Sequence, residues 1–509
     1  MWHRLNRRML ILLPLQELLK NFPWLIVLLI AGAGSRNGPY YGLAGLAFSI
    51  VAGTLRWFTT SYRIAADKVQ VRRGLFRRRT LTVLRDRLRT VDVTANLLHR
   101  IFGLSSITMG TGRSDRKNER GLKLDGLSTS DAAWVRQELL HRTAEVMRPI
   151  SHETSGAPEF TRPTELAHWE PRWIGYGPFT LSGAITVLAV VGFGAQIVND
   201  DHLHPARLGP VHVALQALGS NSTAVAVLAL LVLAALLIAF ASTLGYVLSF
   251  WNFRLTRQTG TLQVTRGLLT TRVISIDEQR LRGVELSEPL LLRLVHGARC
   301  IAIATGLRVG RGAERGGSML VPPAPRAVAE GVSATILGTA VPVQCELLAH
   351  GPTARRRRYT RVFLITLPAL AILLVGWRWG AIPAWPWQLT LALLILGLPL
   401  ARDRYRSLGH AVVGDRLVSR SGSLVRRRCM LSADGIIGWN LHQSFFQRRA
   451  HVVTLVATTA AGRQAYRMQD LTLPEAVRVA EEARPGLLSP FFEPVVLPAR
   501  ESIEAATSR

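Results

Sequence analysis

Residues 97–111 have the sequence LLHRIFGLSSITMGT, and residues 291–305 have the sequence LLRLVHGARCIAIAT. The two stretches lie 194 residues apart (291 − 97), and at this offset Leu97, Leu98, Gly103, Ile107 and Thr111 recur as identical residues. Each stretch combines a leucine pair, a glycine and an apolar segment, which is typical of a short turn followed by a β-strand. A phrase repeated at a fixed spacing indicates an internally duplicated module.

A second pattern, found three times, predicts a β-hairpin in each copy of the module. An alternating apolar/polar segment runs to a glycine (Gly74, Gly267 or Gly422), a short turn follows, and a second segment begins. Alternation on both sides of a glycine turn predicts two antiparallel strands with one buried face. In the third copy, VVTLVAT at 452–458 corresponds to the strand of the opening phrase, and His451 takes the position at which Gly103 aligns with Gly297.

Each module is expected to end in a helix. Residues 128–131 (STSD) and 472–475 (TLPE) match the [ST]-x-x-[DE] capping box, in which side chains bind the free N–H groups at a helix start. The second copy offers PPAPRAVAEGVSATIL, a weaker helical pattern with prolines at its start. The sequence therefore predicts three small β-rolls or sandwiches, each closed by a C-terminal helix.

Six apolar runs precede the three modules in pairs. A helix needs about 20 apolar residues to cross a hydrocarbon layer of roughly 30 Å, so each pair predicts a transmembrane hairpin. A cleaved signal peptide over residues 1–34 is an alternative, but this run leads directly into a second apolar run. The predicted spans are Leu18–Gly34, Tyr41–Phe58, Pro178–Val198, Ala224–Phe250, Val362–Trp379 and Trp385–Leu400.

The positive charge of the chain predicts its topology. The formal net charge is +29, yet the turns inside the three hairpins contain almost no arginine. The modules and tails are rich in arginine, as in RRGLFRRR at 72–79 and RRRR at 355–358. Because basic flanks stay on the cytoplasmic side, both termini and all three modules are expected in the cytoplasm.

These patterns divide the chain into nine predicted segments. The three modules are called repeats 1, 2 and 3 below. The segments are an N-terminal part with the first hairpin (1–61), repeat 1 (62–150), a linker (151–172), the second hairpin (173–252), repeat 2 (253–342), a basic linker (343–359), the third hairpin (360–403), repeat 3 (404–486) and a C-terminal tail (487–509).

The phrases YRIAADKVQVRRGLF, RLRTVDVTANLLHRIFGLSSI and RLRGVELSEPLLLRLVHGARCI resemble the bacterial pleckstrin-homology-like (PH-like) membrane proteins of the YdbT-like family. The resemblance extends over all three repeats, is closest in repeat 1 and is faintest in repeat 3. It implies PH-like barrels with a C-terminal helix in a bacterial inner-membrane protein, and no catalytic residues or cofactors. A PH-like fold does not by itself establish lipid binding.

Arginines after the first glycine turn, and a smaller group in repeat 3, are candidate contacts to anionic lipid headgroups. A guanidinium group fits phosphate oxygens, and each arginine near an anionic leaflet contributes about 1 kcal/mol. The alternative, that these arginines only enforce topology and solubility, is favoured over a specific headgroup pocket, and it is also favoured for RRRR at 355–358. The candidates are Arg72, Arg73, Arg77, Arg78, Arg79, Arg426, Arg427 and Arg428.

Other chemistries have little support in the sequence. The basic charge is spread over membrane-flanking segments without RNA-binding aromatic motifs, so no nucleic-acid partner is expected. Cys300, Cys345 and Cys429 have no metal-ligand spacing and are expected to be free thiols. The polar loop at 199–204 and the glycine-rich segment at 310–317 are expected to be solvated loops, and no nucleophile elbow or zinc-protease helix occurs. We therefore expect no catalytic, cofactor or metal site.

The sequence favours a non-enzymatic membrane scaffold that presents its modules to a protein partner, to anionic lipids or to one another. The alternative is a transport or envelope-stress component whose hairpins act on a solute or peptide, although the predicted spans contain almost no ionisable residue. An enzyme that uses Asp200 and His202 of the outer loop is a third hypothesis. The pattern names neither the partner nor the oligomeric state.

Overall fold

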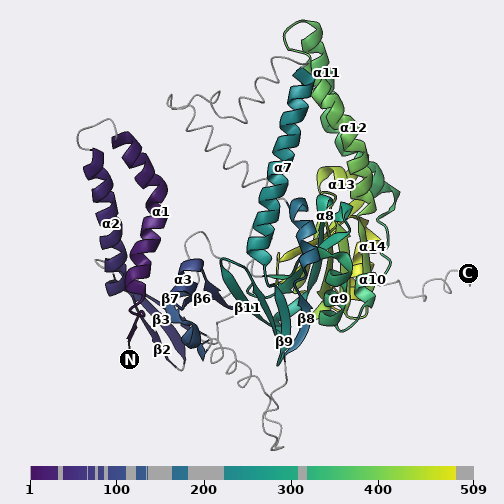
Figure 1. Cartoon of the computed structure of the whole chain (residues 1–509). Helices are drawn as coiled ribbons and strands as arrows, with labels where there is room; N and C mark the ends of the chain where they lie inside the picture. The colour runs from purple at the N-terminus through teal and green to yellow at the C-terminus, as the bar shows by residue number, and fades with distance from the viewer. Residues whose placement is uncertain are drawn as a thin grey trace, which may run out of the picture. The chain divides into compact units, whose positions relative to one another are not determined.

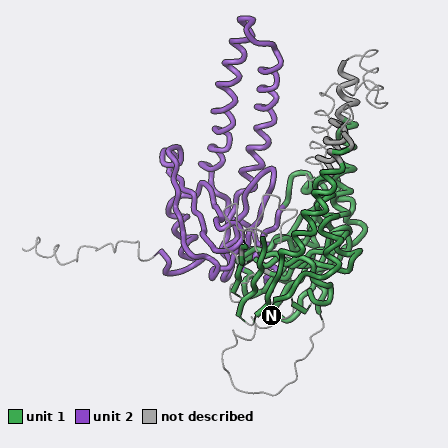
Figure 2. The backbone as a smooth tube through the Cα atoms, turned by 90° about the vertical axis from the view of Figure 1, so that its left-hand side faces the viewer, with its two compact units in different colours: residues 1–281, 288–336 green, residues 282–287, 337–509 purple. Residues whose placement is uncertain are grey.

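The computed structural model describes residues 2–32, 38–65, 67–74, 78–84, 90–110, 122–132, 134–135, 163–180, 223–307 and 318–488. It divides into two compact units (Figure 2). Unit 1 comprises Met1–Leu281 with Glu288–Ile336, and unit 2 comprises Arg282–Ser287 with Leu337–Arg509. The predicted span Pro178–Val198 after residue 180, the polar loop at 199–204 and the glycine-rich loop at 310–317 lie outside the described residues.

Repeat 1 lies in unit 1 and follows a pair of helices that pack side by side, α1 (Met9–Gly32) and α2 (Gly38–Thr59) (Figure 1). Its first sheet has the order β1-β2-β3-β4: β1 His3–Arg4, β2 Ser61–Ile64, β3 Lys68–Arg73 and β4 Arg79–Leu84. Its second group of strands is β5 (Thr90–Ala95), β6 (Leu104–Gly110) and β7 (Leu122–Ser128), with the short helix α3 (Leu97–Ile101) between β5 and β6.

The core of repeat 1 explains the alternating pattern of its sequence. Val69 and Val71 alternate with polar residues along β3 and are fully buried. They pack against Ile107, Met109 and Leu124 of the second group of strands. Because side chains of a strand point alternately to its two faces, the polar residues between the valines face away from this core. The predicted sandwich of two β layers is therefore present in repeat 1.

Repeat 2 follows the helix α7 (Thr223–Phe250) and also belongs mainly to unit 1. Its first strands are β9 (Arg254–Gln258), β10 (Thr261–Arg266) and β11 (Thr271–Asp277). They are joined by β8 (Thr164–His168), which lies inside the predicted linker 151–172, and a 3₁₀ helix η2 (Pro171–Phe179) follows β8. The later elements are η4 (Glu278–Arg280), β12 (Leu281–Pro289), α8 (Leu290–Leu294), β13 (Gly297–Ala304), β14 (Met319–Pro325) and the closing helix α9 (Arg326–Leu337).

Repeat 3 lies in unit 2 and follows α10 (Val341–Gln344) and the helical pair α11 (Gly351–Arg378) and α12 (Trp385–Arg406), which runs away from the strands (Figure 2). Its first strands are β15 (Gly409–Val413), β16 (Arg416–Ser421) and β17 (Val425–Ser432). After η5 (Ala433–Gly435) come β18 (Gly438–His442), α13 (Phe445–Arg449), β19 (Val452–Thr458), β20 (Ala465–Thr472) and the closing helix α14 (Leu473–Ala483).

The three predicted glycine-turn hairpins are confirmed, and they share one register. Gly74, Gly267 and Gly422 have φ angles of 117°, 110° and 102°, a region that favours glycine. In each hairpin, the residue directly before the glycine pairs with the residue five positions after the glycine. The pairs are Arg73 with Arg79, Arg266 with Arg272, and Ser421 with Arg427. This common register gives a residue-by-residue correspondence among β4, β11 and β17.

The alignment of the opening phrase is wrong by one residue. The backbone position with positive φ is Gly103 in repeat 1 (64°), His296 in repeat 2 (54°) and His451 in repeat 3 (52°), whereas Gly297 begins β13. Structurally equivalent residues of repeats 1 and 2 are therefore 193 positions apart in the sequence (296 − 103), and not 194. Matching glycine to glycine misled the alignment, because histidine is one of the residues that tolerate this conformation.

The two predicted capping boxes have different outcomes. The backbone N–H of Asp131 donates to Ser128 Oγ at 3.0 Å, so the first box has the expected hydrogen bond. Helix α14 begins after Thr472 as predicted, but the side chain of Thr472 makes no capping hydrogen bond. A complete capping box occurs instead at Ser444 and Gln447, where α13 begins.

Two helices of the described residues are long and apolar enough to cross a membrane. They are Val232–Phe250 within α7, and α11. Leu43–Thr59 of α2 is a shorter apolar helix. Each overlaps a span that the sequence predicts, and α11 begins eleven residues before its predicted span Val362–Trp379.

Sheets continue from one repeat into the next. In unit 1, β5 of repeat 1 pairs antiparallel with β11 of repeat 2, which gives a sheet of order β7-β6-β5-β11-β10-β9-β8. In unit 2, residues 282–287 of β12 lie beside β17 of repeat 3. The later strands of one repeat thus cover the hairpin edge of the following repeat.

Candidate functional site

The arginines of the first glycine turn lie where α2 meets repeat 1. Arg72 and Arg73 end β3, Arg78 is exposed in the turn, and Arg79 begins β4. Arg77 lies outside the described residues. The hairpin therefore brings Arg73 to the end of an apolar helix that the sequence predicts to cross the membrane.

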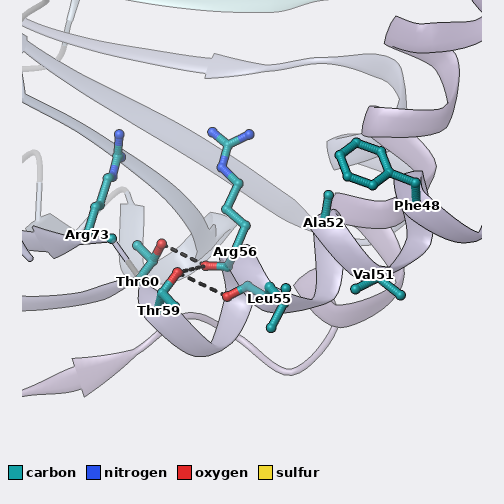
Figure 3. Close-up of a pocket in the computed structure, with 9 residues that line it drawn as sticks. Phe48, Val51, Ala52, Leu55, Arg56, Thr59, Thr60 and Arg73 are labelled. Atoms are coloured by element: carbon teal, nitrogen blue, oxygen red, sulfur yellow. Dashed lines mark hydrogen bonds between the residues drawn. The ribbon is translucent and has the colours of Figure 1, made fainter. Parts of the chain in front are cut away.

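A cavity of about 440 Å³ lies between the last turns of α2 and this hairpin (Figure 3). Helix α2 supplies the apolar side chains and also one guanidinium and one hydroxyl group, and Thr60 and Arg73 supply a second of each. The lining residues are Phe48, Val51, Ala52, Leu55, Arg56, Thr59, Thr60, Arg73 and Gly74.

The hydroxyl groups of the cavity complete the C-terminal end of α2. Thr59 Oγ1 donates to the carbonyl oxygens of Leu55 and Arg56, and Thr60 Oγ1 donates to that of Arg56 (Figure 3). Carbonyl groups of the last helical turn have no partner within the helix and give this end a partial negative charge. Because the threonine hydroxyl groups bind one of these carbonyls, that of Arg56, less negative charge faces the cavity.

The two guanidinium groups have different environments. Arg56 Nη1 lies 3.0 Å from Glu17 Oε1 of α1, so a carboxylate partly neutralises it. Arg73 donates from Nη2 to the backbone oxygen of Lys123. Burial lowers the pKa of Arg73, Asp125 opposes this change, and the neighbouring Arg56 adds to it. An anion placed beside Arg73 would relieve that repulsion.

The arrangement suits an amphipathic anion. An acyl chain can lie along Phe48, Val51 and Leu55, which are exposed on α2, while a phosphate group reaches Arg73. The cavity contains no pair of groups arranged for proton transfer or nucleophilic attack. Its residues support binding rather than a reaction.

The three arginines predicted in repeat 3 all have partners within unit 2. Arg426 pairs with Asp403 at 3.1 Å, Arg427 pairs with Glu285 at 3.2 Å, and Arg428 donates to the carbonyl oxygens of Pro342 and Cys345. Their role as lipid contacts stays a prediction, but these bonds would have to break or be shared for it to operate. Repeat 1 is therefore the better candidate.

Glu285 is the centre of a buried polar cluster that the sequence did not reveal. Its carboxylate receives Arg427 and Arg463, each at 3.2 Å, and the thiol of Cys429 lies 3.7 Å from it. Burial raises the pKa of Cys429, and the negative charge of Glu285 raises it further. The thiol is thus protonated and unreactive at neutral pH. This cluster joins β12 to β17 and to Arg463, which lies between β19 and β20, and it does not form a reactive site.

A second buried cluster joins the base of α11 to β20. Asp470 lies 2.8 Å from Arg358 and 3.3 Å from Arg357, and Gln447 Nε2 donates to it at 2.9 Å. Sequence reasoning assigned the RRRR run at 355–358 to topology alone. The available signal was an aspartate beside Leu471 in the segment that forms strand β20, because a buried carboxylate requires a charged partner.

No group of three His, Cys, Asp or Glu residues that could hold a metal ion occurs among the described residues. The three cysteines are free thiols, and Cys300 and Cys429 are buried. The loop with Asp200 and His202 lies outside the described residues, so the enzymatic hypothesis based on it is not addressed by this geometry.

Comparison with known proteins identifies the repeats. The family model described as "Bacterial PH domain" matches residues 10–143, 213–336 and 358–485. The first match begins in α1 and the third in α11, and each match includes a β module. A transmembrane protein named YdbT from Bacillus subtilis (strain 168) is 21% identical over 448 residues, which cover 85% of this chain and 86% of that protein. No solved structure matches the chain significantly.

Proposed function

The chain belongs to the bacterial PH domain family, and from that premise we propose that it is a non-enzymatic membrane scaffold whose cavity in repeat 1 holds an anionic phospholipid. In this proposal the three helical pairs are transmembrane hairpins, both termini lie in the cytoplasm, and the three PH-like domains present binding surfaces there. The lipid fixes the orientation of the first domain against the bilayer.

The observation that carries the proposal is the position of Arg73 at the foot of an apolar helix. If Leu43–Thr59 crosses the bilayer, its C-terminal end lies at the headgroup layer, and the cavity lies at the same depth. There, the apolar wall faces acyl chains while the guanidinium group faces phosphate. Each part of the cavity thus meets the chemistry that binds it best.

The size of the expected effect follows from the charges. A hydrogen bond to a charged group contributes about 1.5–3 kcal/mol when it is shielded from water. Arg73 is half-buried and already donates to a backbone carbonyl, so a value near the lower end of this range is appropriate. Loss of Arg73 is therefore expected to weaken lipid retention about tenfold.

The test uses the full-length protein in nanodiscs of mixed phosphatidylglycerol and phosphatidylcholine. Lipids that remain bound after release from the nanodisc are counted by native mass spectrometry. Ala52→Phe fills the cavity without changing any charge, and Arg73→Gln removes one cation. Both variants are expected to reduce retained phosphatidylglycerol about tenfold and to leave phosphatidylcholine unchanged.

Arg63→Gln is the matched control, because Arg63 is exposed on β2 of the same domain and does not line the cavity. It makes the same change in net charge as Arg73→Gln. The proposal fails if Ala52→Phe retains phosphatidylglycerol like the wild type, or if Arg63→Gln loses as much as Arg73→Gln. The second result would indicate diffuse attraction to the surface rather than a site.

A further inference from the structure

Two terminal strands of the described sheets have complementary positions in the repeat pattern. β4 ends the sheet β1-β2-β3-β4, and β18 ends the sheet β18-β19-β20. β4 is the last strand of the glycine-turn hairpin of repeat 1, and β18 is the first strand of the second group of repeat 3. In the described residues, neither edge has a neighbouring strand.

The counterparts of β4 in the other repeats are both covered. β11 is paired with β5 of the preceding repeat, and β17 lies beside β12 of the preceding repeat. The common hairpin register places Leu81 at the position of Ile274 and Cys429. Leu81 is 49% exposed, whereas Ile274 is 2% and Cys429 is 8% exposed. The hairpin edge is therefore covered in repeats 2 and 3, whereas no described strand covers it in repeat 1.

The same contrast holds for β18. The residues with positive φ, Gly103, His296 and His451, align Leu441 of β18 with Val93 of β5 and Leu286 of β12. Leu441 is 42% exposed, and Leu286 is 3% exposed. β5 and β12 each cover the hairpin of another repeat, whereas β18 covers no described hairpin.

We propose that β18 of one copy of the chain pairs antiparallel with β4 of a second copy. The register follows from the joint between β5 and β11, in which Val93 pairs with Val273 and Asp92 pairs with Ile274. By correspondence, Leu441 of one copy pairs with Thr80 of the next, and Asn440 pairs with Leu81. This is a head-to-tail contact, which produces a ring if the rotation closes and a filament if it does not.

A second copy is the occupant that the internal joints specify. An exposed strand edge with apolar side chains accepts another strand, and an unrelated strand would match either edge only by chance. The chain itself makes this contact twice, with the same two strand types in the same order. In the joint between β12 and β17, the side chains of Glu285 and Arg427 form an ion pair. The corresponding positions at the proposed joint are those of Asn440 and Arg79. Asparagine retains a carbonyl oxygen that can accept a hydrogen bond at that position.

The decisive experiment uses two full-length proteins that each carry one new cysteine, Thr80→Cys and Leu441→Cys. Since directly opposite Cβ atoms of paired strands lie about 5 Å apart, a short bismaleimide reaches across the proposed joint. Mixing the two proteins in nanodiscs or detergent is expected to give a crosslinked pair of chains that contains one of each. A crosslink between positions 80 and 441 of one chain is excluded, because each protein supplies only one of the two positions.

Replacing Leu441→Cys by Arg63→Cys, on β2, gives the position control, and the wild type controls for the native thiols. If no mixed pair forms while both proteins retain their wild-type thermal unfolding, the proposal is wrong. A mixed pair that forms equally well with Arg63→Cys also overturns it. A pair confined to Thr80 with Leu441 supports it.

Leu81→Lys tests the same joint without crosslinking. Lysine on an exposed edge strand opposes strand addition, so self-association measured by mass photometry is expected to weaken about tenfold. Leu84→Lys is the matched control, since Leu84 is 42% exposed on the same strand but lies outside the register copied from β5 and β11. Equal effects of the two lysines would contradict the proposed register, and no effect of Leu81→Lys would contradict the joint.

Discussion

Replacing Asp470 by asparagine is expected to destabilise repeat 3 by about 3–5 kcal/mol. Asp470 has a φ angle of 63°, and asparagine tolerates this backbone conformation, so the substitution changes the charge with little backbone strain. The carboxylate is fully buried and lies 2.8 Å from Arg358, whose side chain is 1% exposed. Its removal leaves that guanidinium group in the interior without a counter-charge.

The magnitude depends on burial. An exposed ion pair contributes about 0–1 kcal/mol, because water solvates each partner when the pair is broken. In a buried pair, the remaining charge cannot be solvated, and the cost rises to about 3–5 kcal/mol. The hydrogen bond from Gln447 to Asp470 is retained by the asparagine oxygen, so the loss is assigned to the charge. A second guanidinium group, that of Arg357, lies 3.3 Å away and adds to the repulsion.

Hydrogen exchange with mass spectrometry of the full-length protein measures this change locally. A loss of about 3 kcal/mol corresponds to more than about a hundredfold fall in the protection of amides in β19 and β20. Asp415→Asn is the control, since Asp415 is 69% exposed and its ion pair with Arg416 is a surface contact. It is expected to change stability by less than about 0.5 kcal/mol.

A fall in protection of less than about tenfold for Asp470→Asn would refute this account of the buried cluster. The double variant Asp470→Asn with Arg358→Met provides an independent check. Because it removes the uncompensated cation and fills the site with an apolar side chain, it should recover much of the lost protection. A double variant less stable than Asp470→Asn alone would show that Arg358 acts mainly through packing.

Three further predictions concern pH, backbone and association. Burial lowers the pKa of His350 and of His410 to about 4, so both are neutral in the native state above that pH, whereas the histidines of the unfolded chain bind protons below about pH 6.5. Stability is therefore expected to fall as the pH decreases from about 6.5 to about 4. His410→Gln should reduce this fall in a series of thermal-unfolding measurements across that pH range. Gly283→Ala is expected to lower the free energy of unfolding by about 2 kcal/mol or more, because the φ angle of Gly283 is 154° and a Cβ atom there would lie 2.0 Å from a carbonyl oxygen of β17. Gly331→Ala in α9 is the control, because a Cβ atom there meets no atom within 4 Å. It should raise the free energy of unfolding by about 0.5–1 kcal/mol, and denaturant unfolding measures both changes. Asn440→Glu should strengthen self-association several-fold at low salt, because it adds a carboxylate at the position that Glu285 occupies in the joint between β12 and β17. Mass photometry measures the protein concentration at which half of the chains are associated. An unchanged value for Asn440→Glu would count against the proposed register.

Much of the fold was predictable because it depends on local patterns. The turn glycines and the alternation around them fixed the hairpins, since only a few residues adopt positive φ and only one face of each strand is buried. The one-residue error at Gly297 arose where a histidine replaces glycine at such a position. Strand β8 was not predicted, because an edge strand inside a linker has little hydrophobic alternation.

The candidate site was predicted only in part. The sequence singled out the basic turn of repeat 1, including Arg73, but not the cavity, because Phe48 and Arg56 come from a helix that precedes the turn in the chain. For Arg427 and Arg358, the sequence showed a basic run and could not show the buried carboxylates that pair with them. Such pairs join residues more than a hundred positions apart, and no local pattern records them.

The sequence by itself determined that three similar β modules follow three apolar segments, because periodicity, turn glycines and hydropathy are properties of neighbouring residues. Only the tertiary structure decided how successive modules join, namely that β5 pairs with β11 and that β12 lies beside β17. Backbone hydrogen bonds between strands carry almost no side-chain signature, so an edge that is covered and an edge that is exposed can have similar sequences.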